Sequence, residues 1–171
     1  VLVIAPPHLI SQENQGSWEN TFRKLGFPKS QYRCCSIGML DEVIENRYHK
    51  TADIIVVDEA HRFRTENTEM YSKLYQICRD KKVVLVSATP YHNSAQDLLS
   101  QIKLFQNVKH SDIPHLEDLE KFFDHLNKNL KNAKKISKEE LLRVSKKNSS
   151  EIREKLLKYV MVRRTRHEIE T

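Results

Sequence analysis

The stretch Ile54-Ile55-Val56-Val57-Asp58-Glu59-Ala60-His61 gives the strongest indication of fold and chemistry in the chain. Its four β-branched residues are typical of a strand buried on both faces of a parallel sheet. Asp58 and Glu59 follow at the carboxyl end of that strand, where open α/β sheets bind their ligands. An aspartate there can hold Mg²⁺ through water, and a glutamate can deprotonate a water that attacks a phosphate. On position alone, a strand that ends in two solvated acidic residues explains the stretch equally well.

The rest of residues 1–110 alternates between predicted strands and predicted helices. Apolar runs predict buried strands over residues 1–5 and 83–86, with a weaker strand over 33–37. Apolar residues at helical spacing predict helices after Ser17, near residue 40, over residues 67–80, and after Asn93 or Ser94. Met70, Leu74 and Ile77 lie on one face of the expected 67–80 helix. This alternation predicts an α/β fold with an open, mostly parallel sheet and helices on both faces.

The chain changes character after residue 110, where the strand patterns stop. Residues 115–130 are amphipathic, Ser137 opens a capping box, and Ser149 or Ser150 is expected to cap a further helix. We therefore predict two domains, an α/β domain over residues 1–110 and a Lys-rich helical insert over residues 111–171. Residues 121–166 hold 15 basic and 5 acidic residues, against 14 and 12 in residues 1–110. This surplus favours a polyanion such as nucleic acid, although a solvated helical face explains it equally well.

Composition excludes several classes of protein. The chain has 171 residues with 29 basic and 23 acidic side chains, and no apolar run long enough for a membrane helix. Its three cysteines (Cys34, Cys35 and Cys78) have no zinc-ligand spacing and form no disulfide scaffold. They fit a reducing, intracellular location: the cytoplasm or nucleoid of a prokaryote, or the nucleus of a eukaryote. None of the three glycines stands directly before a Lys-Ser or Lys-Thr pair, so no Walker A phosphate loop is present.

Taken in order, the segments of this chain resemble helicase superfamily two, and most of all its Swi/Snf-type DNA-dependent ATPases. Asp58-Glu59-Ala60-His61 matches the DEAH box, and Ser87-Ala88-Thr89-Pro90 resembles the third motif of the family. The run Val3-Ile4-Ala5-Pro6, followed by Trp18 and Phe22, resembles the motif Ia region, and Cys35–Leu40 stands where the family has motif Ib. Met161–Arg166 resembles the segment that closes the first lobe.

The resemblance implies a RecA-like lobe 1 of an ATP hydrolase of the EC 3.6.4 class. Asp58 would bind Mg²⁺·ATP through water, and Glu59 would be the catalytic base. His61, with Ser87, Ala88 and Thr89, would couple the nucleotide state to nucleic acid. Phosphates of the nucleic acid would meet the turns and side chains of Pro6, Pro7, His8, Ser36, Gly38, Arg163 and Arg164. Trp18 is expected to be a core anchor rather than a platform for base stacking.

The family's Walker A loop and its second RecA-like lobe, which carries an arginine finger, have no counterpart in residues 1–171. We therefore expect this segment to be inactive alone and to belong to an ATP-dependent translocase or helicase. Its partners would be nucleic acid, most of all double-stranded DNA, and the second lobe, with no membrane involved.

Two alternatives stay open. One is a non-catalytic lobe that binds nucleic acid or protein. The other is a metal-dependent nuclease that uses Asp58, Glu59 and a histidine, which needs a further carboxylate or lysine around the same metal.

Overall fold

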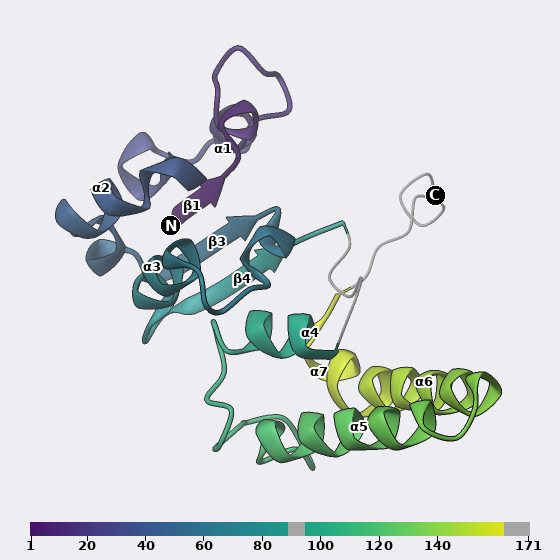
Figure 1. Ribbon diagram of the computed structural model, residues 1–171. Coiled ribbons are helices and arrows are strands. Elements are labelled where there is room, and N and C mark those ends of the chain that lie inside the picture. Colours follow the sequence, from purple (N-terminus) through teal and green to yellow (C-terminus); the bar gives the residue numbers. More distant parts are fainter. Residues whose placement is uncertain (89–94, 163–171) are drawn as a thin grey trace. The chain divides into compact units, whose positions relative to one another are not determined.

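The structure is a computed structural model that describes residues 1–88 and 95–162 (Figure 1). The chain divides into two compact units, residues 1–105 and residues from 106 onward, which we call the α/β unit and the helical unit. This division lies close to the boundary that the sequence predicts after residue 110. That the two units are separate domains stays a prediction. Among the described helices, none has the length and apolar character needed to cross a membrane.

Among the described residues, four parallel strands form one sheet in the α/β unit. They are β1 (Leu2–Ala5), β2 (Arg33–Ser36), β3 (Ile54–Asp58) and β4 (Lys82–Val86), in the order β2-β1-β3-β4. The predicted α/β fold is confirmed, and every pairing in the sheet is parallel. The central strands β1 and β3 are apolar along almost their whole length, which suits strands that are covered on both faces.

Helices cover both faces of this sheet, as predicted. The short helix α2 (Leu40–Glu45) and α3 (Glu69–Cys78) pack on the face that holds Leu2, Ile4, Ile55 and Val57. The opposite face holds Val3, Ala5 and Val56 and packs against α1 (Trp18–Lys24). Single turns of 3-10 helix connect these elements, at Pro7–Leu9, Lys29–Gln31, Ile37–Met39, Tyr48–Thr51 and Ala60–Phe63.

Two helix predictions in the α/β unit can be compared directly with the structure. Ser17 caps α1 as predicted, because its side chain accepts a hydrogen bond from the backbone N–H of Asn20. In α3, Leu74 and Ile77 are buried, whereas Met70, expected on the same face, is 43% exposed. Met70 lies in the first turn of the helix.

The burial of strand β4 differs from its prediction. Its apolar sequence suggested burial on both faces, but Val84 is 49% exposed and Val86 is 38% exposed. Val83 and Leu85 pack into the core under α2 and α3, whereas Val84 and Val86 point to the opposite face, outside the apolar cluster of α1. Within the described residues, β4 pairs only with β3 and is an edge strand. An edge strand has fewer neighbours to cover it, which explains the alternating burial.

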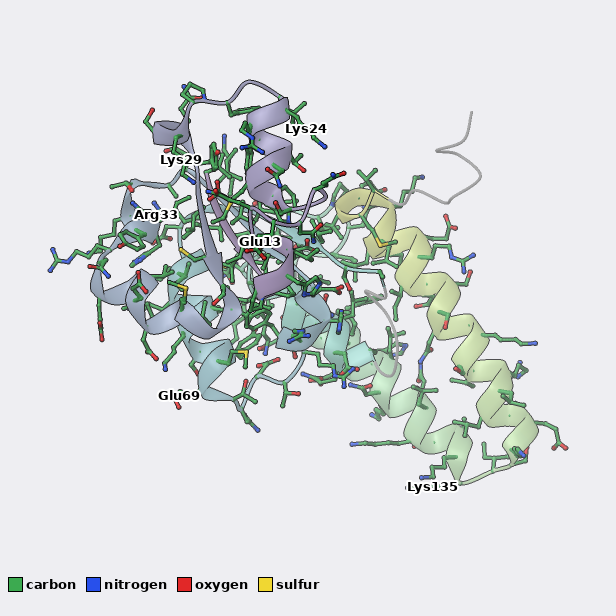
Figure 2. All side chains as sticks on the ribbon, turned by 90° about the horizontal axis from the view of Figure 1, so that it is seen from above. Glu13, Lys24, Lys29, Arg33, Glu69 and Lys135 are labelled. Atoms are coloured by element: carbon green, nitrogen blue, oxygen red, sulfur yellow. The ribbon has the colours of Figure 1, made fainter. Side chains whose placement is uncertain are left out.

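After β4, α4 (Ala95–Ile102) completes the described helices of the α/β unit. The helical unit contains α5 (Leu119–Lys134), α6 (Lys138–Ile152), a π-helical turn (Arg153–Leu157) and α7 (Lys158–Val160). The helices α5 and α6 form a hairpin, in which the Asn148 side chain donates a hydrogen bond to the carbonyl of Leu126 (2.9 Å). Lys135 lies at the turn between them (Figure 2).

The caps of α6 confirm one prediction and overturn another. Ser137 caps the helix as expected, since its hydroxyl accepts a hydrogen bond from the N–H of Glu140 at 3.0 Å. Ser149 and Ser150 begin no helix, because α6 continues through both of them. The Ser149 hydroxyl donates instead to the carbonyl of Ser145 (3.0 Å), which lets a serine sit inside a helix without breaking it.

Candidate active site

The segments predicted to carry chemistry meet at one edge of the sheet. Ala5 pairs with Ser36, Ile4 pairs with Val57, and Asp58 pairs with Val86, so all four strands end together. The turns that follow are therefore neighbours at this edge: Pro6–His8 after β1, residues 37–39 after β2, Glu59–His61 after β3, and Ser87 and Ala88 after β4. The sequence placed these segments far apart, and the parallel topology brings them together.

Asp58 is the last residue of β3 and is half-buried. One carboxylate oxygen, Oδ1, accepts a hydrogen bond from the backbone N–H of Glu59 at 2.8 Å. The other, Oδ2, accepts a hydrogen bond from the indole Nε1–H of Trp18, also at 2.8 Å. Each carboxylate oxygen can accept two hydrogen bonds, so both retain a free acceptor direction. A half-exposed carboxylate of this kind suits a hydrated Mg²⁺, which prefers oxygen ligands and keeps several waters.

Glu59 has an unusual backbone conformation for a residue other than glycine. Its φ is 53° and its ψ is 43°, in the left-handed region, which costs about 1–2 kcal/mol for a residue with a Cβ. This bend ends the strand and starts the 3-10 turn Ala60–Phe63, in which the Arg62 N–H bonds to the Glu59 carbonyl at 3.0 Å. Strained residues of this kind concentrate at functional sites, where the surroundings hold them in place.

His61 lies next to the Glu59 carboxylate. Its Nδ1 is 3.0 Å from Glu59 Oε2, with about a third of each side chain exposed. The Nδ1 atom is itself shielded from solvent, and no group in the described part of the chain forms a well-aligned hydrogen bond with it. His61 Nδ1 and Glu59 Oε2 are therefore in close contact without a well-aligned hydrogen bond.

The remaining predicted site residues have different surroundings. Pro7, His8 and Gly38 are exposed, Ser36 is half-buried, and Pro6 is buried under the turn. Ser87 is half-buried and Ala88 is exposed, just beyond β4. Thr89, Arg163 and Arg164 lie outside the described residues. The expected coupling role of His61 with Ser87, Ala88 and Thr89 stays a prediction.

Trp18 is a site residue that the sequence reasoning missed. We expected a core anchor, and its ring does pack 5.9 Å from that of Phe22 in the apolar cluster on this face of the sheet. Its indole N–H nevertheless points to Asp58, a residue that lies 40 positions further along the chain. No sequence spacing signals this contact, because it depends on how α1 crosses the sheet.

A polar network behind the site was also missed. The Glu66 carboxylate accepts hydrogen bonds from the Ser100 hydroxyl (2.8 Å) and from Lys103 Nζ (2.9 Å). Burial raises the pKa of Glu66, but the hydrogen bonds from Lys103 and Ser100 outweigh it and leave the pKa below its ordinary value. Tyr71 adds a hydrogen bond from its hydroxyl to the Ser100 carbonyl (2.6 Å). The loop after the Glu59 turn is thereby tied to the end of α4.

The cysteines show no metal-binding arrangement. Across residues 1–88 and 95–162, no group of three or more His, Cys, Asp or Glu side chains is arranged to hold a metal ion. All three cysteines are free thiols. Burial raises the pKa of Cys34 and of Cys78 to about 12 each, and burial also raises the pKa of Cys35. These thiols stay protonated at neutral pH and are poor metal ligands.

The comparisons with known proteins indicate the family of the chain. The family model of the SNF2-related domain matches residues 21–171, which is most of the chain. A comparison with curated proteins gives no match. The matched range contains β2, β3 and β4, and with them the carboxylates at the end of β3. The chain therefore belongs to the SNF2-related domain family, a Snf2-type branch of helicase superfamily two whose members are ATP-dependent helicases and translocases that act on nucleic acid.

Proposed function

We propose that this chain is the DEAH-box lobe 1 of an ATP-dependent translocase that moves on double-stranded DNA. The observation that carries the proposal is the pair Asp58 and Glu59 at the carboxyl edge of the sheet. Asp58 is fixed by two hydrogen bonds and keeps open acceptor directions, while Glu59 stands beside it on a strained turn. Membership of the SNF2-related domain family supports ATP as the substrate, with Mg²⁺ as its metal.

The side chains at this edge have complementary tasks. When bound, Mg²⁺·ATP supplies the phosphoryl group, and the metal neutralises charge on its oxygens. Asp58 holds the hydrated metal, and Glu59 orients the attacking water and accepts its proton. His61 stands 3.0 Å from Glu59 and is placed to respond when the charge on that carboxylate changes. With Ser87, Ala88 and Thr89, His61 couples nucleotide state to nucleic acid.

Nucleic acid is proposed to run along the turns after β1 and β2. The exposed residues Pro7, His8 and Gly38 lie there, and their backbone is accessible to phosphates. Contacts of this kind, together with those from Ser36, Pro6, Arg163 and Arg164, give affinity without reading base sequence. Double-stranded DNA is the substrate that the Swi/Snf resemblance favours. We propose a location where DNA is present: the cytoplasm or nucleoid of a prokaryote, or the nucleus of a eukaryote.

The phosphate loop and the arginine finger of the proposed ATPase come from outside residues 1–171. Asp58 and Glu59 can hold a hydrated metal and a water, but no glycine-rich Lys-Ser or Lys-Thr loop in this chain can hold the β- and γ-phosphates. We therefore propose that the 171-residue segment alone does not turn over ATP, and that a second RecA-like lobe completes the site.

The test is ATP hydrolysis by the full-length protein, with and without double-stranded DNA. We expect DNA-stimulated hydrolysis that the substitution Glu59→Gln lowers by at least about a hundredfold, because it removes the base while preserving side-chain shape. Glu69→Gln is the matched control, since Glu69 is an exposed carboxylate on α3 whose ion-pair partner is Lys73. Equal rates for Glu59→Gln and the unsubstituted protein would overturn the assignment of Glu59. A full-length protein that binds DNA without hydrolysing ATP would favour the non-catalytic lobe.

A further inference from the structure

We infer that Trp18 is a positioning residue for Asp58: its indole N–H fixes the carboxylate that holds the metal. The inference rests on the proposed ATPase function. It starts from the hydrogen bond between Trp18 Nε1 and Asp58 Oδ2 (2.8 Å), which joins α1 to the end of β3. Indole nitrogen is only a donor, so this contact requires an acceptor oxygen and cannot be reversed.

The two donors to Asp58 act on different oxygens. The Glu59 N–H holds Oδ1 and the Trp18 N–H holds Oδ2, each at 2.8 Å. A carboxylate with a single donor can rotate about its Cβ–Cγ bond, whereas donors on both oxygens fix the plane of the group. The remaining acceptor directions then point the same way in every molecule. Donors of this kind behind a metal ligand commonly change metal affinity or activity by 10–100-fold when removed.

Trp18 is itself held rigidly by the segment that precedes it. Ser17 is fully buried and caps α1. Asn20 is also buried, and its side-chain amide donates to the carbonyls of Gln12 (2.9 Å) and Asn14 (2.7 Å). The loop before α1 and the first turn of α1 are thereby locked together, and the indole ring packs against Phe22. A donor that is held rigidly restrains the position of its acceptor. A donor on a mobile side chain would move together with the acceptor and would not restrain it.

The contact also explains why a tryptophan suits this position. The ring supplies apolar surface to the cluster on this face of the sheet, while its N–H reaches the polar edge. Phenylalanine would keep most of the apolar contact but would lose the N–H donor. The substitution Trp18→Phe therefore separates the positioning role from the packing role.

The first experiment reads the hydrogen bond itself in the 171-residue chain. Trp18 is the only tryptophan of this sequence, so a ¹H–¹⁵N NMR spectrum contains a single indole N–H signal to assign. We expect a signal protected from solvent exchange. Asp58→Ala should accelerate that exchange by about tenfold or more, the factor that corresponds to losing a hydrogen bond to a charged group. An indole signal that exchanges equally fast in both chains would overturn the inference.

The second experiment measures the Mg²⁺ concentration that gives half-maximal ATP hydrolysis by the full-length protein. We expect Trp18→Phe to raise this concentration by about tenfold. Tyr32→Leu is the matched control, because Tyr32 belongs to the same apolar cluster and stacks on Phe22 rather than on Trp18. It should lower thermal stability and leave the Mg²⁺ requirement unchanged.

Three results distinguish the possibilities. An unchanged Mg²⁺ requirement in Trp18→Phe overturns the positioning role while the ATPase function stands. An equal rise in Tyr32→Leu assigns the effect to packing and also overturns it. A full-length protein without any ATP hydrolysis overturns the proposed function first, and the positioning role falls with it.

Discussion

The two units of this chain differ in how sequence relates to chemistry. In the α/β unit, basic and acidic residues nearly balance, and the strands β1 and β3 are fully covered along most of their length. In the helical unit, one buried stripe supports two long helices, and positive charge dominates the rest of their surface. The α/β unit gathers side chains from four strand ends at one edge, whereas the described residues of the helical unit form helices and contribute no strand ends.

This difference shows where specific chemistry can arise. A parallel sheet places the ends of strands that are distant in sequence within reach of one another. A helical hairpin presents a repeating surface, so its charge acts collectively through many similar positions. We therefore expect substitutions in the two units to change different properties of the protein.

The largest effect on stability is expected in the buried stripe of the helical unit. Phe123 is completely buried, so Phe123→Ala should lower the free energy of unfolding by about 3–5 kcal/mol. The adjacent Phe122 is only half-buried, and Phe122→Ala should cost clearly less. Urea denaturation followed by circular dichroism measures both. Similar losses for the two variants would show that no single stripe supports this unit.

A smaller effect is expected for DNA affinity after charge reversal on the hairpin. Lys131, Lys134 and Lys135 are exposed, and their combined replacement by Glu should weaken DNA binding at low salt by about tenfold or more. The control reverses three exposed basic residues of the α/β unit, Arg47, Lys50 and Arg79, and changes the net charge equally. Titration by fluorescence anisotropy at two salt concentrations measures the affinity. Unchanged affinity in the hairpin variant would mean that the positive charge of the hairpin keeps the helices hydrated and does not contribute to DNA binding.

The Glu66 network should contribute stability that depends on pH. Its pKa lies below the ordinary value of 4.5, so the carboxylate stabilises the fold at neutral pH. This contribution is lost as the pH falls through the lowered pKa. Glu66→Gln should cost about 1 kcal/mol at pH 7 and less at pH 3, since the stabilisation by the charged carboxylate declines as the pH falls below 4.5 toward the lowered pKa. Thermal unfolding at both pH values checks this, and an equal cost at pH 3 would contradict it.

The smallest effect is expected on the exposed face of β4. Val84 pairs with Val56 in the sheet, yet Val84 is 49% exposed and Val56 is 8% exposed. Val84→Thr should change the free energy of unfolding by less than about 0.5 kcal/mol, whereas Val56→Thr buries a hydroxyl and should cost about 1–3 kcal/mol. Chemical denaturation of the two variants compares them. A large loss from Val84→Thr would show that this face is covered.

Much of the fold followed from local patterns. The apolar run before Asp58 predicted a buried strand, Ser17 and Ser137 predicted helix starts, and all three predictions are confirmed. The errors arose where a local pattern depends on distant neighbours. Val84 and Val86 have the sequence of a covered strand but lie at the edge of the described sheet, and Ser149 has the sequence of a cap but lies inside a helix.

The sequence by itself determined the types of element, the order of the strand-end motifs and the identity of the two carboxylates. These depend on the spacing and chemistry of residues that are neighbours in the chain. Only the tertiary structure decided that Trp18 donates to Asp58, that Glu59 adopts a left-handed conformation, and that β4 leaves one face exposed. The physical reason is that these features arise from contacts across the sheet, and sequence periodicity carries no information about which helix crosses which strand.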